Sequence, residues 1–382
     1  MLLGNECLFD AEFHLIAGKR VGLITNHSGV DAGLRATADR LHDGADVELV
    51  ALFGPEHGIR GDAADGAVVD GARDGRTGAP VHSLYGERRQ PDADLLAAID
   101  VLLFDIQDVG ARFYTYLYTM SLSMEACAAH SVPFVVLDRP NPIGGEHIAG
   151  NILDPEFASF VGRYAIPIRY GMTVGELALL FNAEFSIGAE LHVVRLKDWR
   201  RACYWEETGL PWVPPSPNMP TSDTALVYPG MCYFEGTNIS EGRGTCKPFE
   251  QVGAPYIDSA RLSDHLNGLD LPGTLFRPVF FQPTAGKYAG ETCQGVQVHV
   301  VDRALFEPVR TGFTALDAVR RLWPSDFAWR IPRGGIHNFD RLAGTDRIRL
   351  ELDAGTPVDE LMAAWEGGLE TFRQIRQRYL LY

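Results

Sequence analysis

The 382-residue chain lacks the features of several large protein classes. No apolar stretch approaches the roughly 20 residues needed to cross a bilayer, and the N-terminus carries Glu6, Asp10 and Glu12 where a signal peptide would be apolar. Basic residues are in the minority, 34 against 50 acidic residues, which gives a formal net charge of −16. A surface that binds nucleic acid or an anionic membrane needs a basic footprint, so we expect neither partner. The sequence predicts a soluble, cytoplasmic protein that binds a small molecule, and it leaves the oligomeric state open.

Signatures of metal, disulfide and cofactor sites are also missing. The six cysteines are scattered without a C-x-x-C pair, which argues against a zinc ribbon or a disulfide framework. None of the eleven histidines pairs with another at i, i+2 or i, i+4 spacing, so a dedicated metal cage is not expected. No Walker loop, G-x-S-x-G elbow or H-E-x-x-H motif appears, and the turn after the first predicted strand has no G-x-G-x-x-G. The sequence therefore predicts no cofactor and no metal.

The first half of the chain alternates between two kinds of segment. A short β-branched apolar run is followed by a polar turn and then by a helix-period segment, which is typical of a parallel sheet covered by helices on both faces. The predicted strands are 21–25, 47–53, 101–105, 133–138 and 190–196. The predicted helices are 34–42, a segment that ends at 99, 117–130 and 173–185.

A change of pattern divides the chain into two parts. Five prolines between residues 210 and 222 exclude a regular helix or a central strand there. Beyond this segment the pattern loosens into glycine-rich loops, a strand at 294–301 and helices at 314–323 and 358–379. The predicted fold class is α/β, with a Rossmann-like parallel-sheet domain at 1–210, a proline-rich connector at 211–222 and a smaller α+β domain at 223–382.

Polar residues follow four of the predicted strands at the point where each strand ends. In open parallel sheets, ligands bind outside the carboxyl ends of the strands, where helix N-termini converge. The candidate site residues in these turns are Asn26 after the first strand, Glu56 and His57 after the second, Asp105, Gln107 and Asp108 after the third, and Arg139 and Asn141 after the fourth. Such residues also serve as ordinary loop and capping residues, but four clusters at strand ends favour a binding site.

Glu56 is the sharpest of these candidates. It lies between Pro55 and His57 in a turn bounded by two glycines, so its carboxyl group is free to project into the crevice. A partly desolvated carboxyl group there has a raised pKa and can serve as a general acid. The alternative is a glutamate hydrogen-bonded to its own loop. Arg60 follows as a candidate cation for orienting the carboxyl group or binding substrate.

Two later segments add further candidates. Thr173 and Glu176 have the spacing of a capping box before an apolar helix, which alone accounts for both residues, although Glu176 is also a candidate for substrate contact. The segment 234–245 is dense in glycine and hydrogen-bonding side chains, and such loops usually line a ligand site. Its candidate residues are Glu235, Asn238, Glu241 and Arg243.

Five segments together carry a family resemblance: GPEHGIRGD at 54–62, DIQDVGARFYTY at 105–116, DRPNPIGG at 138–145, YGMTVGELA at 170–178 and FEGTNISEGRGT at 234–245. Over nearly its whole length the chain resembles the NamZ-type exo-β-N-acetylmuramidases, a glycoside hydrolase family formerly known as DUF1343. The resemblance implies a Rossmann-like catalytic domain, a smaller C-terminal domain that contributes to the cleft, and release of N-acetylmuramic acid from the non-reducing ends of peptidoglycan fragments in cell-wall turnover. It also implies that Glu56 is the leading catalytic residue.

The chemistry of such a substrate directs attention to particular side chains. The lactyl carboxylate of muramic acid needs a guanidinium group, for which the motifs offer Arg60, Arg112, Arg139 and Arg243. Sugar faces stack on aromatic rings, and the candidates are Phe113, Tyr114, Tyr116 and Tyr170. Two carboxyl groups normally flank a scissile glycosidic bond. The second is Asp105, Asp108, Glu235 or Glu241, unless the substrate's own acetamido group acts as nucleophile; the stereochemical outcome stays open.

Two departures from the family pattern leave rival hypotheses in place. Ala149 stands where an acidic residue often precedes the glycine after NPIGG, and many relatives carry export signals that are not seen here. One rival is a non-catalytic muropeptide- or sugar-binding protein on the same fold. The other is a hydrolase that acts on a different acidic small molecule.

Overall fold

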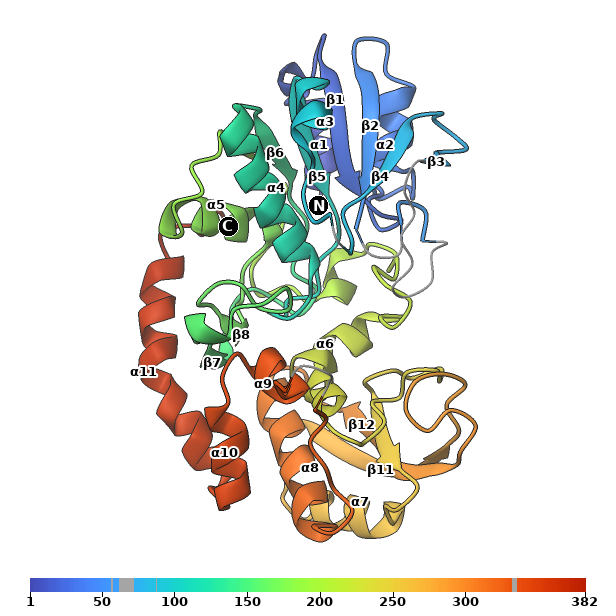
Figure 1. Ribbon diagram of the computed structural model, residues 1–382, viewed down its shortest axis with the longest axis vertical. Coiled ribbons are helices and arrows are strands. Elements are labelled where there is room, and N and C mark those ends of the chain that lie inside the picture. The colour runs from blue at the N-terminus through green and yellow to red at the C-terminus, as the bar shows by residue number, and fades with distance from the viewer. Residues whose placement is uncertain (56–57, 62–71, 87, 332–334) are drawn as a thin grey trace.

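The computed structural model describes residues 1–55, 58–61, 72–86, 88–331 and 335–382. Two domains are stacked along the longest axis of the molecule (Figure 1). The larger domain contains a seven-stranded sheet, and the smaller domain contains a three-stranded sheet. This arrangement confirms the predicted fold class.

The large sheet has the strand order of a Rossmann-like fold. Its strands lie in the order β3-β4-β2-β1-β5-β6-β9, and all neighbours are parallel except β3 and β4. The bounds are β1 Arg20–Thr25, β2 Glu48–Gly54, β3 Ala72–Arg73, β4 Pro80–Ser83, β5 Val101–Asp105, β6 Phe134–Leu137 and β9 Leu191–Val194. The order reverses between β1 and β5, where such sheets open a crevice at the carboxyl ends of their strands.

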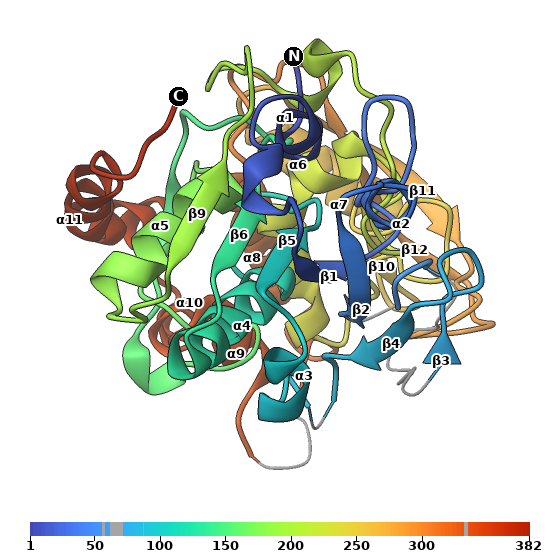
Figure 2. The same ribbon diagram turned by 90° about the horizontal axis from the view of Figure 1, so that it is seen from above.

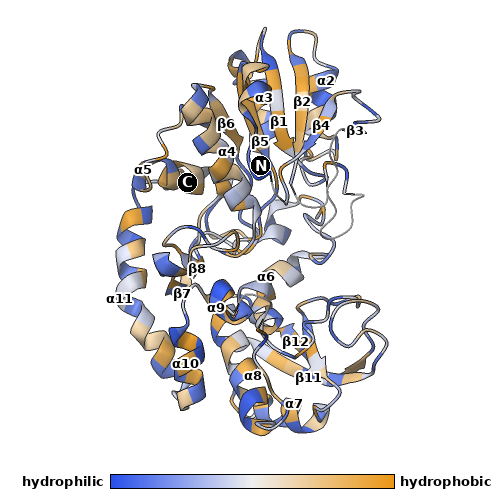
Figure 3. Cartoon of the chain, viewed as in Figure 1, coloured by the Kyte–Doolittle hydropathy of each residue, from blue (hydrophilic) through white to orange (hydrophobic). Residues whose placement is uncertain are grey.

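Alternate side chains of the sheet enter two separate cores. Leu102 and Phe104 of β5 point into the core on one face, whereas Val101 and Leu103 point into the core on the other. All four are buried, as predicted for a strand covered on both faces, and β1 and β2 are coloured as largely hydrophobic in Figure 3. Residues of α3 (Ala93–Ala97), α4 (Tyr116–His130) and α5 (Val174–Glu184) cover the first face, and residues of α1 (Gly4–Asp10) and α2 (Thr37–His42) cover the second. Figure 2 shows the sheet between these layers.

The smaller domain is an antiparallel sheet with several helices. Its strands are ordered β10-β12-β11, with bounds Gln251–Ala254 for β10, Thr274–Phe281 for β11 and Cys293–Val300 for β12. The helices are α6 Ser222–Met231, the 3-10 helix η4 Cys232–Gly236, α7 Ser259–Asn267, α8 Pro308–Leu322, α9 Asn338–Ala343, α10 Arg347–Ala354 and α11 Val358–Arg376. Helices α6 and α8 pack closely because Gly230 meets Gly312; a Cβ atom on Gly230 would lie 1.8 Å from the Pro308 carbonyl oxygen.

The C-terminal segment returns to the larger domain. Helix α11 packs against β7 (Ala149–Ile152), which forms a two-stranded sheet with β8 (Pro167–Arg169). The chain then ends beside α5 (Figure 1). There the Tyr382 hydroxyl group donates to Asp138 at 2.6 Å and accepts from the Leu196 amide at 2.8 Å.

Two predicted helices have different starting points in the structure. The helix predicted at 34–42 begins only at Thr37, because Leu34 has a φ of 64° that no right-handed helix accommodates. The helix predicted at 314–323 begins six residues earlier, at Pro308, where proline is well suited to the first turn. Along the described parts of the chain, no helix combines the length and apolar character needed to cross a membrane.

Candidate active site

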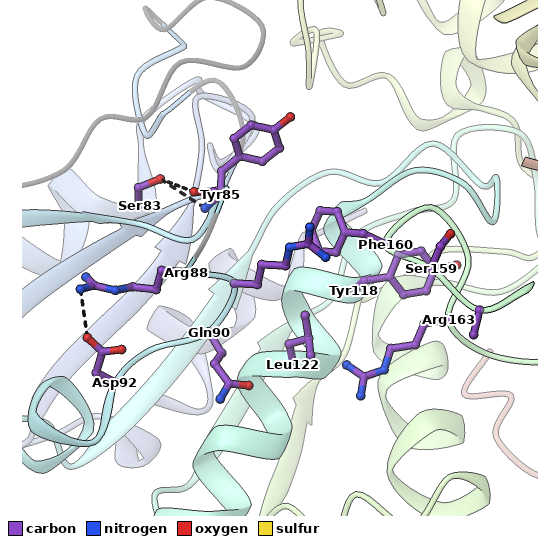
Figure 4. A pocket seen from close by; sticks show the side chains of 12 residues that line it. Ser83, Tyr85, Arg88, Gln90, Asp92, Tyr118, Leu122, Ser159, Phe160 and Arg163 are labelled. Carbon is purple, nitrogen blue, oxygen red and sulfur yellow. Dashed lines mark hydrogen bonds and ion pairs between the residues drawn. The ribbon is translucent and has the colours of Figure 1, made fainter. Parts of the chain in front are cut away.

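Two adjoining cavities lie near the end of β4; the first is lined by residues of the larger domain, and the second lies between the two domains. They share Arg89, Ser159 and Phe160 and have volumes of about 990 and about 1190 Å³. We call the first the β4 cavity, because Ser83 at the end of β4 and Tyr85 form one side of it; Figure 4 shows Phe160 on the side opposite Tyr85. We call the second the interdomain cavity. Its wall in the smaller domain is formed mainly by Glu235, Thr237, Asn238, Glu241, Arg243, Lys287, Tyr288, Arg330, Asn338 and Arg341.

The turn that carries the leading candidate is only partly described. Glu56 and His57 lie outside the described residues. On one side of them, β2 ends at Gly54, whose carbonyl oxygen accepts from the Leu84 amide at 2.8 Å. Leu84 directly follows Ser83, which lines the β4 cavity. The described beginning of this turn is therefore hydrogen-bonded to the edge of the sheet at which the cavity opens.

Asp105 and Arg139 form a buried ion pair behind the cavities. The Arg139 guanidinium donates to Asp105 at 2.5 Å, and the Thr37 hydroxyl group donates to the same carboxylate at 2.6 Å. Arg139 also donates to the Val30 carbonyl oxygen at 2.9 Å. Both side chains of the pair are at most 3% exposed. The pair therefore ties together the carboxyl ends of β5 and β6 and leaves neither group free for a ligand.

Asp108 is a buried carboxyl group with a displaced pKa. It accepts a hydrogen bond from the Gly110 amide at 2.8 Å and another from the Tyr170 hydroxyl group. Burial raises its pKa to about 7, against the opposing effect of the backbone amides. Gln107 donates to the backbone of Asp108 and Pro140. Of these residues, none lines either of the two cavities.

Several other candidates hold the backbone of neighbouring segments. Asn26 donates to the Pro215 carbonyl oxygen at 3.0 Å, and the Tyr116 hydroxyl group donates to the same atom at 2.7 Å. Asn141 donates to the Met172 carbonyl oxygen at 2.9 Å. The first two contacts fix the proline-rich connector against the end of β1 and the start of α4. Asn26 also lines a separate cavity of about 460 Å³ at the end of β1.

The aromatic candidates pack within the core. Tyr114 meets Tyr116 and Tyr228 edge-on, with ring centroids 4.9 and 6.0 Å apart. Phe113 meets Tyr228 and Tyr233 in the same way, at 5.1 and 5.6 Å. Burial raises the pKa of Tyr114 well above its ordinary value. These rings join the two domains, whereas Phe160 and Tyr288 are the aromatic side chains that line the interdomain cavity.

Arg60 and Arg112 bind groups of the protein itself, and neither lines the β4 cavity or the interdomain cavity. Arg60 binds Asp74 through two hydrogen bonds of 2.8 and 2.7 Å and also binds Asp39 at 2.7 Å. Arg112 is completely buried and donates only to backbone carbonyl groups. These are the carbonyl groups of Asn151, Ile166, Leu342 and Ala343, at 2.7, 2.8, 3.3 and 2.6 Å.

Glu176 and Asn238 also have structural partners. Thr173 and Glu176 form the predicted capping box at the start of α5, and Glu176 additionally binds Arg201 and the Leu381 amide. Asn238 lies at the cavity wall, but its side chain donates to the Asp326 carbonyl oxygen at 2.7 Å and accepts from the Ala328 amide at 3.0 Å. It thereby fixes the segment that leads to Arg330.

Glu235, Glu241 and Arg243 are the predicted candidates that the structure brings together in the interdomain cavity. Arg243 binds Glu235 at 2.7 Å and lies 3.6 Å from Glu241. Lys287 binds Glu241 at 2.8 Å and donates to two carbonyl groups of the 234–245 loop. Burial lowers the pKa of Lys287, against the opposing effect of Glu241. The Glu235 side chain is 27% exposed and that of Glu241 only 6%, so Glu235 is the more accessible to a ligand.

Four cations that line the interdomain cavity were not among the sequence candidates. Arg89, Lys287, Arg330 and Arg341 all lie outside the five motif segments, in stretches whose local pattern predicts no site. The sequence offers one indication of their role: basic residues are in the minority in this chain, 34 against 50 acidic residues. For a metal, the described residues offer no group of three or more histidine, cysteine, aspartate or glutamate side chains.

Comparison with known proteins gives one consistent family. Residues 21–223 match the model of exo-β-N-acetylmuramidase NamZ, N-terminal, and residues 226–382 match the C-terminal model. The peptidoglycan β-N-acetylmuramidase NamZ of Bacillus subtilis (strain 168) is 52% identical over 367 residues, which cover 96% of this chain and 88% of that protein. Two solved structures of DUF1343 family proteins from Bacteroides fragilis NCTC 9343 have TM-scores of 0.92 and 0.75 and identities of 41% and 31%. Each match covers 100% of this chain and 98% of the other.

Proposed function

Since the chain belongs to the NamZ family of exo-β-N-acetylmuramidases, we propose that it is a glycoside hydrolase that releases N-acetylmuramic acid from the non-reducing ends of peptidoglycan fragments. The observation that carries the proposal is the interdomain cavity, which combines carboxylates and guanidinium groups and adjoins the cavity at the carboxyl end of β4. A muramyl sugar requires both kinds of group. Carboxyl groups cleave its glycosidic bond, and a cation matches its lactyl carboxylate.

Glu56 is our proposed general acid. The turn that contains it follows β2 at the carboxyl edge of the sheet, next to the strand end that lines the β4 cavity. Apolar surroundings at such an edge raise the pKa of a carboxyl group, which keeps it protonated for transfer to the leaving oxygen. This assignment is supported by the turn's position and by the family resemblance of the GPEHG segment.

Glu235 is our proposed second carboxylate. Asp105 is committed to its buried ion pair, and Asp108 does not line either cavity. Glu241 is almost wholly covered by its bond to Lys287. Glu235 remains accessible and lies 2.7 Å from the Arg243 guanidinium group. A carboxyl group is the side chain that serves as nucleophile or general base in glycoside hydrolysis. The alternative to a second carboxylate is that the acetamido group of the substrate acts as the nucleophile at the anomeric carbon.

Replacement of the proposed acid tests the function. Glu56→Gln is expected to lower kcat/KM about 100-fold to 10,000-fold on a disaccharide of N-acetylmuramic acid β-linked to N-acetylglucosamine, because that leaving group needs a proton. The loss is expected to be smaller on a nitrophenyl β-N-acetylmuramide, whose leaving group needs little protonation. Glu48→Gln is the matched control, since Glu48 is exposed at the opposite end of the same strand, and it should leave both rates unchanged.

The same assay separates the rival hypotheses. Glu235→Gln should lower the rate on both substrates if this group is the nucleophile or the base. An unchanged rate on the disaccharide with Glu56→Gln would reject the proposed acid. Wild-type protein that binds N-acetylmuramic acid but cleaves neither substrate would be a sugar-binding protein. If the wild-type protein neither binds N-acetylmuramic acid nor cleaves either substrate, its substrate is a different acidic small molecule.

A further inference from the structure

The interdomain cavity is rich in cations although the chain as a whole is acidic. Its described lining contains five cationic side chains and two carboxylates: Arg89, Arg243, Lys287, Arg330, Arg341, Glu235 and Glu241. Both carboxylates are already neutralised, Glu235 by Arg243 and Glu241 by Lys287. An excess of positive charge in the cavity of a chain with a net charge of −16 indicates an anionic ligand.

Three arginines supply this excess, and two of them, Arg330 and Arg341, belong to the smaller domain. Among the described residues, neither Arg330 nor Arg341 has a carboxylate within ion-pair distance. Elsewhere in the same domain the chain does provide such partners, since Arg303 binds both Glu206 and Asp223. The third is Arg89, which has no acidic partner among the described residues and belongs to the larger domain; its guanidinium group stacks 4.5 Å from the centre of the Phe160 ring.

Arg330 is carried by backbone that is fixed on both sides. Its amide donates to the Gly236 carbonyl oxygen at 2.8 Å, and its carbonyl oxygen accepts from the Asn338 amide at 3.1 Å. Gly236 ends η4, directly after Glu235. The start of the Arg330 side chain is therefore held next to the proposed second carboxylate on one side and next to helix α9 on the other.

Arg341 is carried by helix α9, in which Phe339 and Asp340 are held by contacts outside the cavity, while Asn338 and Leu342 line the cavity with Arg341. Phe339 is completely buried and packs on Tyr233 with ring centroids 5.4 Å apart. Asp340 binds Arg349 through two hydrogen bonds of 2.8 and 2.9 Å. These contacts fix the rotation of the helix about its axis, and Arg341 lines the cavity as a consequence.

We propose that Arg330 and Arg341 bind the lactyl carboxylate of the muramyl sugar and select muramides over glucosaminides. The inference rests on the proposed function. A guanidinium group presents a planar fork that matches a carboxylate with two parallel hydrogen bonds, and the lactyl group is the feature that a glucosaminide lacks. Specificity then lies in the smaller domain, outside the conspicuous motifs, whereas the proposed acid belongs to the larger domain.

The test compares substrates that differ only in the charge of the lactyl group. The probes are a nitrophenyl β-N-acetylmuramide with a free lactyl carboxylate and the same compound as its lactyl methyl ester. Arg330→Gln and Arg341→Gln are each expected to lower kcat/KM on the acid at least about tenfold and to leave the rate on the ester nearly unchanged. Arg277→Gln is the matched control, because Arg277 lies on β11 of the same domain and binds Gln297 instead of a carboxylate.

Binding of the free sugar gives a readout that does not depend on turnover. Calorimetric titration with N-acetylmuramic acid should show at least about tenfold weaker binding by both variants, and N-acetylglucosamine should bind all proteins equally weakly. Equal losses on the acid and the ester, or no loss on either, would overturn the assignment. If the wild-type protein cleaves neither compound but binds N-acetylmuramic acid more tightly than both variants do, the proposed hydrolysis is rejected. The assignment of the two arginines to the lactyl carboxylate is then still supported.

Discussion

Two buried aspartates at the carboxyl edge of the sheet hold their protons to unusually high pH. Burial raises the pKa of Asp108 and of Asp138 to about 7 in each case, although backbone amides oppose the shift. For Asp138, the Tyr382 hydroxyl group opposes it as well. An unfolded aspartate has a pKa near 4. Between about pH 4 and pH 7 the folded protein therefore keeps protons that the unfolded chain has released.

This difference makes folding less favourable as the pH rises through that window. Each group lowers the free energy of unfolding by up to about 1.4 kcal/mol per pH unit. Asp108→Asn removes one of the two groups. The decrease in the free energy of unfolding with rising pH should therefore become shallower by up to about 1.4 kcal/mol per pH unit. Urea denaturation at pH 5, 6 and 7 measures it. Asp94→Asn, at an exposed position of α3, is the control and should keep the wild-type slope. A wild-type slope in Asp108→Asn would contradict the raised pKa of Asp108.

Residue type within a motif does not reveal whether a side chain faces a cavity or the core. Arg112 and Arg243 both lie in motif segments and both were candidates for binding the lactyl carboxylate. Arg243 does line the interdomain cavity, whereas Arg112 is buried among carbonyl groups. The two acceptors at Leu342 and Ala343 come from a helix about 230 residues later in the chain. No local pattern contains that information, so the sequence alone could not show which of the two arginines lines a cavity.

At the scale of elements, the sequence predicts strands and helices best where the hydrophobic residues follow a single clear pattern. The strands β1 and β5 follow from short apolar runs, and the capping box of α5 follows from the Thr173–Glu176 spacing; the structure confirms these predictions. Helix α6 was missed because Pro229 and Gly230 normally end a helix. Here the absence of a side chain on Gly230 allows the tight packing against α8, and that tertiary contact outweighs the local preference.

Helix α9 was also missed, since six residues are too few to show a helical period. Its stability comes from outside the helix. Arg112 and Asn151 of the larger domain donate to the Ala343 carbonyl oxygen at 2.6 and 2.7 Å, which satisfies the end of the helix. The contact of Arg112 with the end of α9 accounts for a buried arginine at this position.

Replacement of Arg112 should loosen this helix. Arg112→Met removes the donors and leaves buried carbonyl groups unpaired, which is expected to lower the free energy of unfolding by about 3 kcal/mol or more. Hydrogen exchange should also become faster at the amides of α9. Arg347→Met, at an exposed position of α10, is the matched control and should change the stability by less than about 0.5 kcal/mol. Unchanged stability in Arg112→Met would mean that the carbonyl groups find other partners.

At the scale of the whole molecule, the two domains share one continuous core. Phe113 of the larger domain packs edge-on against Tyr228 and Tyr233 of the smaller one. The same cluster of buried residues extends from Ile24 in β1 to Phe372 in α11. The connector at 211–222 stays the predicted domain boundary. Buried residues on both sides of it belong to the same core cluster. The interdomain cavity thus lies between two domains that pack against each other through this core.

A shared core predicts that the domains unfold together. Separation of the domains would expose the Phe113 cluster and leave the Arg112 guanidinium without its partners in α9, so a state with one folded domain is costly. Denaturation followed by far-UV circular dichroism and by tryptophan fluorescence should give one coincident transition, since Trp199 and Trp205 report on the larger domain and Trp329 and Trp365 on the smaller. The calorimetric and van't Hoff enthalpies should also agree. Two separate transitions would show that the core contacts between the domains contribute little, and the cavity would then be expected to open and close as the domains move.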